Sequence, residues 1–88
     1  MKILVIEDSV RLADTIAEAL QNENYVVDTA NDGQLGYEHA STGIYDMVIL
    51  DLMLPKMNGY EVLSALRRDG YNVPVLILSA KTEIDDKI

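Results

Sequence analysis

Residues 47–59 have the sequence MVILDLMLPKMNG and decide the fold. The first four residues are apolar without alternation and mostly branched, which is typical of a parallel strand buried on both faces. Asp51 ends this run, and Pro55, Asn58 and Gly59 predict a turn after it. A carboxylate at the carboxyl end of a central parallel strand points into the crevice where open α/β sheets bind ligands. The alternative is that Asp51 only caps the turn.

The rest of the chain alternates between predicted strands and helices. Predicted strands cover residues 3–6, 25–29, 47–50 and 75–78, and predicted helices follow Ser9, Gly33 and Asn58, with the start of another after Thr82. This order implies a mostly parallel, doubly wound α/β sheet with right-handed crossovers. Polar Asp28 and Thr29 place the second strand at an edge. In the weak second helix, residues 34–41, Leu35 and Ala40 are the apolar residues, and Gly36 costs up to about 1 kcal/mol relative to Ala.

Composition narrows the class of protein. A length of 88 residues allows one small domain, and 49% hydrophobic with 25% charged residues is ordinary for a globular chain. The net charge of −8 argues that these residues do not themselves grip a nucleic-acid backbone. There is no cysteine for a disulfide or thiolate site. Glu7 and Asp8 interrupt the first apolar run too early for a signal peptide or membrane span, so we expect a cytoplasmic protein.

Carboxylates end two of the predicted strands. Glu7 and Asp8 follow the first strand, and Asp51 follows the third. In a doubly wound sheet these strands lie side by side where the connections reverse, so the three carboxylates should meet in one crevice. Like charges at such distances repel unless one takes up a proton or a cation binds among them, and oxygen ligands with retained waters suit Mg²⁺. The alternative is that Glu7 and Asp8 only solvate a loop and cap the helix after Ser9.

These motifs together resemble the receiver domain of bacterial two-component response regulators. The resemblance covers all 88 residues: the acidic pair, Asp51, the LPKMNG turn, and Ser79 followed by Ala80. It implies a flavodoxin-like (CheY-like) strand order 2-1-3-4-5, of which the fifth strand and last helix are missing from this chain. Residues 1–88 are therefore expected to form a partial receiver domain.

The resemblance also implies roles for individual residues. Asp51 would accept a phosphoryl group from a histidine kinase. Asp8, Asp51 and the backbone carbonyl of Met53 would be the Mg²⁺ ligands, with Glu7 acting through bound water. Asp51 would be the nucleophile, and the ion would neutralise charge on the transferred oxygens.

After the fourth strand, Ser79 would turn to hold the phosphoryl group and Ala80 would leave it room. The family's lysine at the end of a fifth strand has no counterpart here, and Lys81 is expected to be a solvated loop residue. We therefore expect poor phosphoryl uptake by these 88 residues. Without a fifth strand, residues 75–78 would form an uncovered apolar edge through which the chain self-associates.

The sequence also indicates what the receiver domain would control and which other functions compete with this interpretation. The opening MKILVIED and the DLMLP turn resemble the OmpR/PhoB-type branch of transcription regulators, so DNA would be bound only through a C-terminal domain absent here. A stand-alone receiver in a phosphorelay is the alternative. A flavodoxin-like Mg²⁺-dependent phosphohydrolase would carry a second Asp where Met53 stands, so we expect no enzyme. The acidic loop after the first strand would repel the phosphates of a nucleotide or flavin. His39 and Lys56 are expected at the surface.

Overall fold

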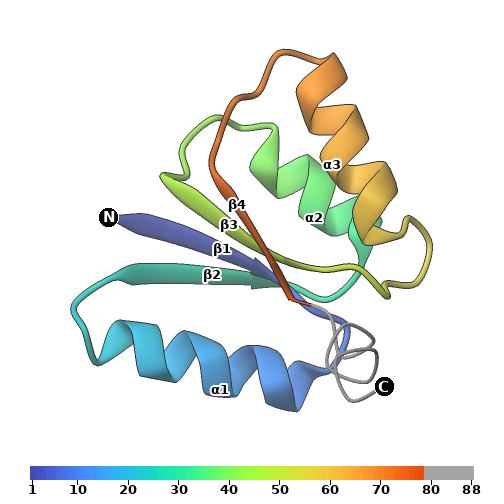
Figure 1. Ribbon diagram of the computed structural model, residues 1–88. Coiled ribbons are helices and arrows are strands. Elements are labelled where there is room, and N and C mark those ends of the chain that lie inside the picture. Colours follow the sequence, from blue (N-terminus) through green and yellow to red (C-terminus); the bar gives the residue numbers. More distant parts are fainter. Residues whose placement is uncertain (79–88) are drawn as a thin grey trace, which may run out of the picture.

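The computed structural model describes residues 1–78, in which strands and helices alternate along the chain (Figure 1). The strands are β1 (Lys2–Ile6), β2 (Val26–Ala30), β3 (Met47–Asp51) and β4 (Val75–Leu78). The helices are α1 (Val10–Gln21), α2 (Gly33–Ala40) and α3 (Gly59–Arg68). Each predicted element within the described residues is therefore present, with its ends within a residue or so of the prediction.

The four strands form one parallel sheet in the order β2-β1-β3-β4. This order confirms the doubly wound, flavodoxin-like arrangement and the edge position of β2. Ile6 of β1 pairs with Leu50 of β3. Because of this register, the two strands end level with each other, and the residues that follow them emerge side by side.

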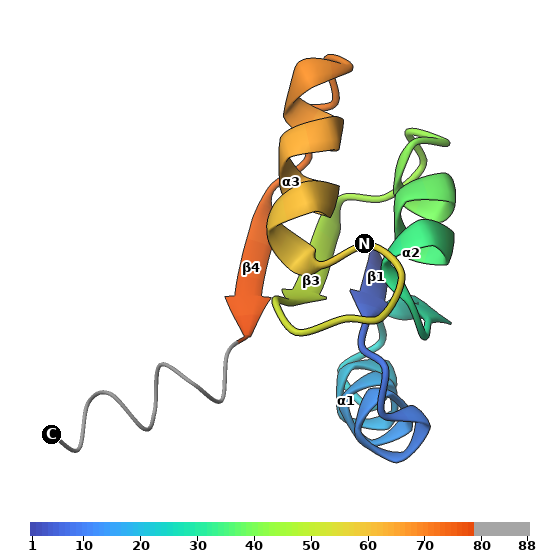
Figure 2. The same cartoon turned by 90° about the vertical axis from the view of Figure 1, so that its right-hand side faces the viewer.

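Helices cover the two faces of the sheet unequally. α1 lies on one face, whereas α2 and α3 share the other (Figures 1 and 2). Ala13 and Ala17 of α1 are buried. β1 and β3 supply the centre of the core because they lie between both layers; their fully buried side chains are Ile3, Leu4, Val5, Ile6, Val48 and Leu50.

The inward face of α2 is formed by small residues. Leu35 is 43% exposed, whereas Ala40 is buried. Gly36 is also buried, and a Cβ atom built on it would lie 2.6 Å from the Ile6 side chain. Glycine therefore lets α2 approach β1 closely, which explains its presence in a helix where it has poor intrinsic propensity.

β4 joins the sheet through β3. Leu78 pairs with Asp51, and the N–H of Leu52 donates to the carbonyl of Leu78 at 3.3 Å. Within residues 1–78 no strand pairs with the other edge of β4, and its apolar residues Leu76 and Ile77 are 51% and 41% exposed.

The described helices are also informative about membranes. None of those within residues 1–78 combines the length and the apolar character that a membrane crossing requires.

Candidate metal and phosphoacceptor site

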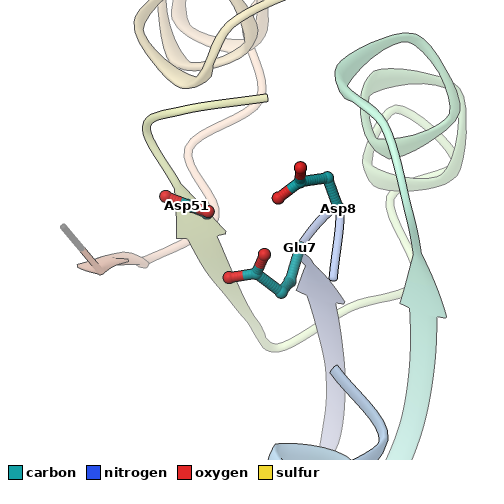
Figure 3. A group of neighbouring side chains, drawn as sticks. All are labelled: Glu7, Asp8 and Asp51. Atoms are coloured by element: carbon teal, nitrogen blue, oxygen red, sulfur yellow. The ribbon is translucent and has the colours of Figure 1, made fainter. Parts of the chain in front are cut away.

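The predicted acidic residues come together at the carboxyl ends of β1 and β3. One carboxylate oxygen from each of Glu7, Asp8 and Asp51 lies within 4.8 Å of the others. Figure 3 shows the Glu7 and Asp8 side chains from the end of β1 on the same side of the sheet as Asp51 at the end of β3. The prediction that these three residues share one crevice is confirmed.

The three carboxylates differ in their surroundings. Glu7 is only 4% exposed, and its Oε2 accepts a hydrogen bond from the N–H of Ser9 at 3.0 Å. Asp51 is half-buried and accepts from the N–H of Met53 at 3.1 Å. Asp8 is exposed. The site therefore combines a buried carboxylate, Glu7, with an exposed one, Asp8, so that an ion can reach it from solvent.

Electrostatics at Glu7 reflect this burial. Desolvation raises the pKa of Glu7 from its ordinary 4.5 to about 7; the Ser9 N–H opposes the shift, and the neighbouring Asp8 and Asp51 carboxyls add to it. No ion pair of the described residues involves any of the three. A hard divalent cation with oxygen ligands would satisfy this group of carboxylates, so the donor set fits Mg²⁺.

The loop after Asp51 is fixed by its connection to α3. Asn58 caps the helix, with its side chain accepting from the N–H of Glu61 and the Glu61 carboxylate accepting from the N–H of Asn58, both at 3.0 Å. The N–H of Gly59 donates to the carbonyl of Leu52 at 2.9 Å, and a Cβ atom at Gly59 would lie 2.5 Å from the carbonyl oxygen of Asp51. Glycine is therefore required for this close return of the chain.

The other predicted residues follow Asp51 in its loop, lie on α2 or fall outside the described part. Met53 follows Asp51 in the loop with its side chain 66% exposed. Lys56 is exposed, as expected, and its ammonium lies 3.8 Å from the carboxylate of Asp32. His39 is in the last turn of α2. Ser79 and Ala80 lie outside the described residues.

Sequence reasoning missed one contact of the site. The Nδ2 of Asn31, in the turn between β2 and α2, donates to the backbone carbonyl of Glu7 at 3.0 Å. The sequence NDG identifies the turn but not its neighbours, because the same residues form turns that touch nothing. The parallel β1–β2 pairing was the available signal, since it places the residues after β2 beside those after β1.

Curated relatives match along the whole chain. The transcriptional regulatory protein DltR of Streptococcus agalactiae serotype III (strain NEM316) is 43% identical over 88 residues, and the regulator CusR of Escherichia coli (strain K12) is 38% identical over the same length. The chain spans 39% of the length of each of these relatives.

Solved structures match the fold closely. The response regulator TrrA of Thermotoga maritima, in complex with Mg²⁺ and BeF, superposes with a TM-score of 0.87 at 31% identity, covering 99% of this chain and 76% of that one. The receiver domain of the Francisella response regulator 1452 gives 0.86 at 30% identity, covering 96% and 73%. The family described as the response regulator receiver domain matches residues 3–88. By sequence, strand order and acidic cluster alike, the chain belongs to the response regulator receiver domain family.

Proposed function

We propose that this chain is the phosphoacceptor part of a response regulator, that Asp51 takes the phosphoryl group, and that residues 1–88 are a portion of one receiver domain. The observation that carries the proposal is the meeting of Glu7, Asp8 and Asp51 within 4.8 Å at the ends of adjacent strands. Asp51 is the best candidate for the nucleophile because it lies at the end of the central strand β3, half-buried and oriented by the Met53 N–H.

The proposed ligands for Mg²⁺ are Asp8, Asp51 and the backbone carbonyl of Met53, with Glu7 acting through bound water. The exposed position of Asp8 and the buried one of Glu7 support this division, because Glu7 is withdrawn below the open side of the site. When bound, the ion supplies charge neutralisation for the phosphoryl oxygens. Glu7 and Asp8 then serve to hold that charge next to the Asp51 carboxylate.

The proposed reaction is phosphoryl transfer from a histidine kinase to Asp51. The bond between phosphorus and the histidine nitrogen breaks as a bond to an Asp51 oxygen forms, and the nitrogen keeps the electron pair of the broken bond. Ser79 is proposed to hold the phosphoryl group and Ala80 to leave it room. Their support is positional: they directly follow Leu78, which pairs with Asp51 in the sheet.

The proposed setting is a cytoplasmic two-component system that controls transcription. DltR and CusR are named as transcriptional regulatory proteins, and the chain matches 39% of their length, so DNA binding is assigned to a C-terminal domain outside these residues. The net charge of −8 agrees with this division of labour. The chain itself is proposed to be a signalling domain and not an enzyme.

The test of the proposed function is covalent labelling of the 88-residue chain. Incubation with acetyl phosphate and Mg²⁺ should add one phosphoryl group slowly, as measured by intact mass, and Asp51→Asn should abolish the addition. Asp14→Asn, at an exposed position on α1, is the matched control and should be labelled like the wild type. Labelling that persists in Asp51→Asn, or never occurs in the wild type, contradicts the proposal.

We also propose that the 88-residue chain pairs with a second copy through β4. The exposed Leu76 and Ile77, together with the unpaired outer edge of β4 within the described residues, support this pairing. Replacing Ile77 by Lys should return the chain to a monomer in sedimentation at high micromolar concentration, whereas Val26→Lys on the other edge strand should not. A wild type that sediments as a monomer contradicts the pairing.

A further inference from the structure

The turn between β2 and α2, residues 31–33, contacts both loops that carry the acidic cluster. Asn31 bonds the loop after β1, and Asp32 and Gly33 contact the loop after β3. We propose that this turn is a positioning brace for the metal site. The inference rests on the Mg²⁺ site proposed above and adds three residues that do not themselves carry a proposed ligand.

Toward the loop after β1, hydrogen bonds hold the backbone on both sides of Glu7, one from Asn31 of the brace and one to Ala30 at the end of β2. The Nδ2 of Asn31 donates to the Glu7 carbonyl at 3.0 Å, and the N–H of Glu7 donates to the carbonyl of Ala30 at 3.0 Å. Asn31 and Ala30 are neighbours at the end of β2, and their two hydrogen bonds to Glu7 restrict rotation of its backbone. Because Asp8 follows in the chain, its carboxylate is aimed from a fixed point.

Toward the loop after β3, the brace makes a close backbone contact. The N–H of Gly33 donates to the carbonyl of Pro55 at 3.3 Å. A Cβ atom on Gly33 would lie 1.6 Å from the carbonyl oxygen of Met57, so any other residue would push this loop away.

An ion pair reinforces the same contact. The Asp32 carboxylate, with its side chain only 13% exposed, caps α2 by accepting from the N–H of Leu35 at 2.8 Å and lies 3.8 Å from the Lys56 ammonium. Lys56 itself has a φ of +67°, a left-handed conformation that is costly for lysine. The loop thus keeps a strained residue whose side chain reaches back to the brace.

These contacts have one consequence for the metal site. Its proposed ligands come from two separate loops, and their spacing is set by whatever holds the loops relative to each other. Residues that hydrogen-bond to metal ligands do not touch the ion, but removing them commonly weakens metal affinity. Asn31 and the Asp32–Lys56 pair are such partners here.

The experiment measures Mg²⁺ affinity in folded protein, by NMR titration of backbone amides at a temperature where every variant is folded. Asn31→Ala should weaken Mg²⁺ binding about tenfold. Lys56→Ala should weaken it about threefold, as expected for a partly exposed ion pair, and Lys56→Arg should restore it. Asn72→Ala, the same change at an exposed asparagine in the loop before β4, should stay within about twofold of the wild type.

A second readout needs no metal. In metal-free Asn31→Ala the amide resonances of Asp8 and Met53 should move, whereas those in Asn72→Ala should not. If Asn31→Ala lowers the unfolding temperature but binds Mg²⁺ as tightly as the wild type, the turn has only a structural role and the inference is wrong. If the wild type binds no Mg²⁺, the metal proposal fails instead, and unmoved Asp8 and Met53 resonances would then overturn the brace separately.

Discussion

The carboxylates at the two ends of the sheet have opposite surroundings. Near the amino ends of β1 and β3, Asp46 accepts from the Lys2 N–H at 2.7 Å. The carboxylate of Asp28, in the middle of β2, also has partners there: it accepts from the Tyr45 hydroxyl at 2.7 Å and lies 3.8 Å from the Lys2 ammonium. At the carboxyl ends, Glu7 and its two acidic neighbours face one another. Partnered carboxylates stabilise the fold, whereas clustered ones oppose it until a cation binds.

Adding Mg²⁺ should give the largest change in the free energy of unfolding, and it should act only through the carboxylates at the carboxyl end of the sheet. At a concentration about 100 times its dissociation constant, the ion should raise the free energy of unfolding by about 2.7 kcal/mol, because it binds only the folded chain. Urea unfolding at pH 8 followed by circular dichroism measures this. Asp8→Asn should lose most of the increment and Asp46→Asn should keep it. Equal increments in these two variants would contradict the assignment of the metal to the carboxyl end.

Neutralising Glu7 should stabilise the metal-free protein. The folded pKa of about 7 exceeds the ordinary 4.5, so the folded state binds more protons between these values, and wild-type stability should fall as the pH rises through that window. Glu7→Gln should remove this dependence and raise the free energy of unfolding at pH 8 by about 2 kcal/mol. Asp28→Asn, at the partnered end, should lower it. The comparison is wrong if both variants change stability in the same direction in urea titrations.

Removing the Tyr45 hydroxyl should change the free energy of unfolding least, and should lower it, whereas Mg²⁺ and Glu7→Gln raise it. Burial, followed by the bond to Asp28, raises the pKa of Tyr45 to about 12. Tyr45→Phe should cost about 1 kcal/mol at pH 7, because the bond to a charged but partly exposed acceptor is lost. Since the folded pKa exceeds the ordinary 10, wild-type stability should decline above pH 10, and this decline should be smaller in Tyr45→Phe. If Tyr45→Phe has the same urea midpoint as the wild type both at pH 7 and above pH 10, this prediction is wrong.

The sequence predicted what depends on local pattern. Buried runs identified β1 and β3, and the alternation of elements predicted a parallel sheet. With the strand order that the family resemblance implies, the meeting of Glu7, Asp8 and Asp51 followed. The sequence did not show which side of α2 faces the sheet, where Leu35 is exposed and Gly36 is buried, since a helix with a glycine inside it can turn either face inward. Nor could it predict that Asn31 bonds to Glu7, because that contact joins two loops that are distant in sequence.

The hydrogen bond between the Leu52 N–H and the Leu78 carbonyl connects the loop after β3 directly to the end of β4. Leu52 immediately follows Asp51, and Leu78 is the residue before Ser79. A displacement of the backbone after Asp51 would therefore shift the carboxyl end of β4 as well, without rearrangement of the core.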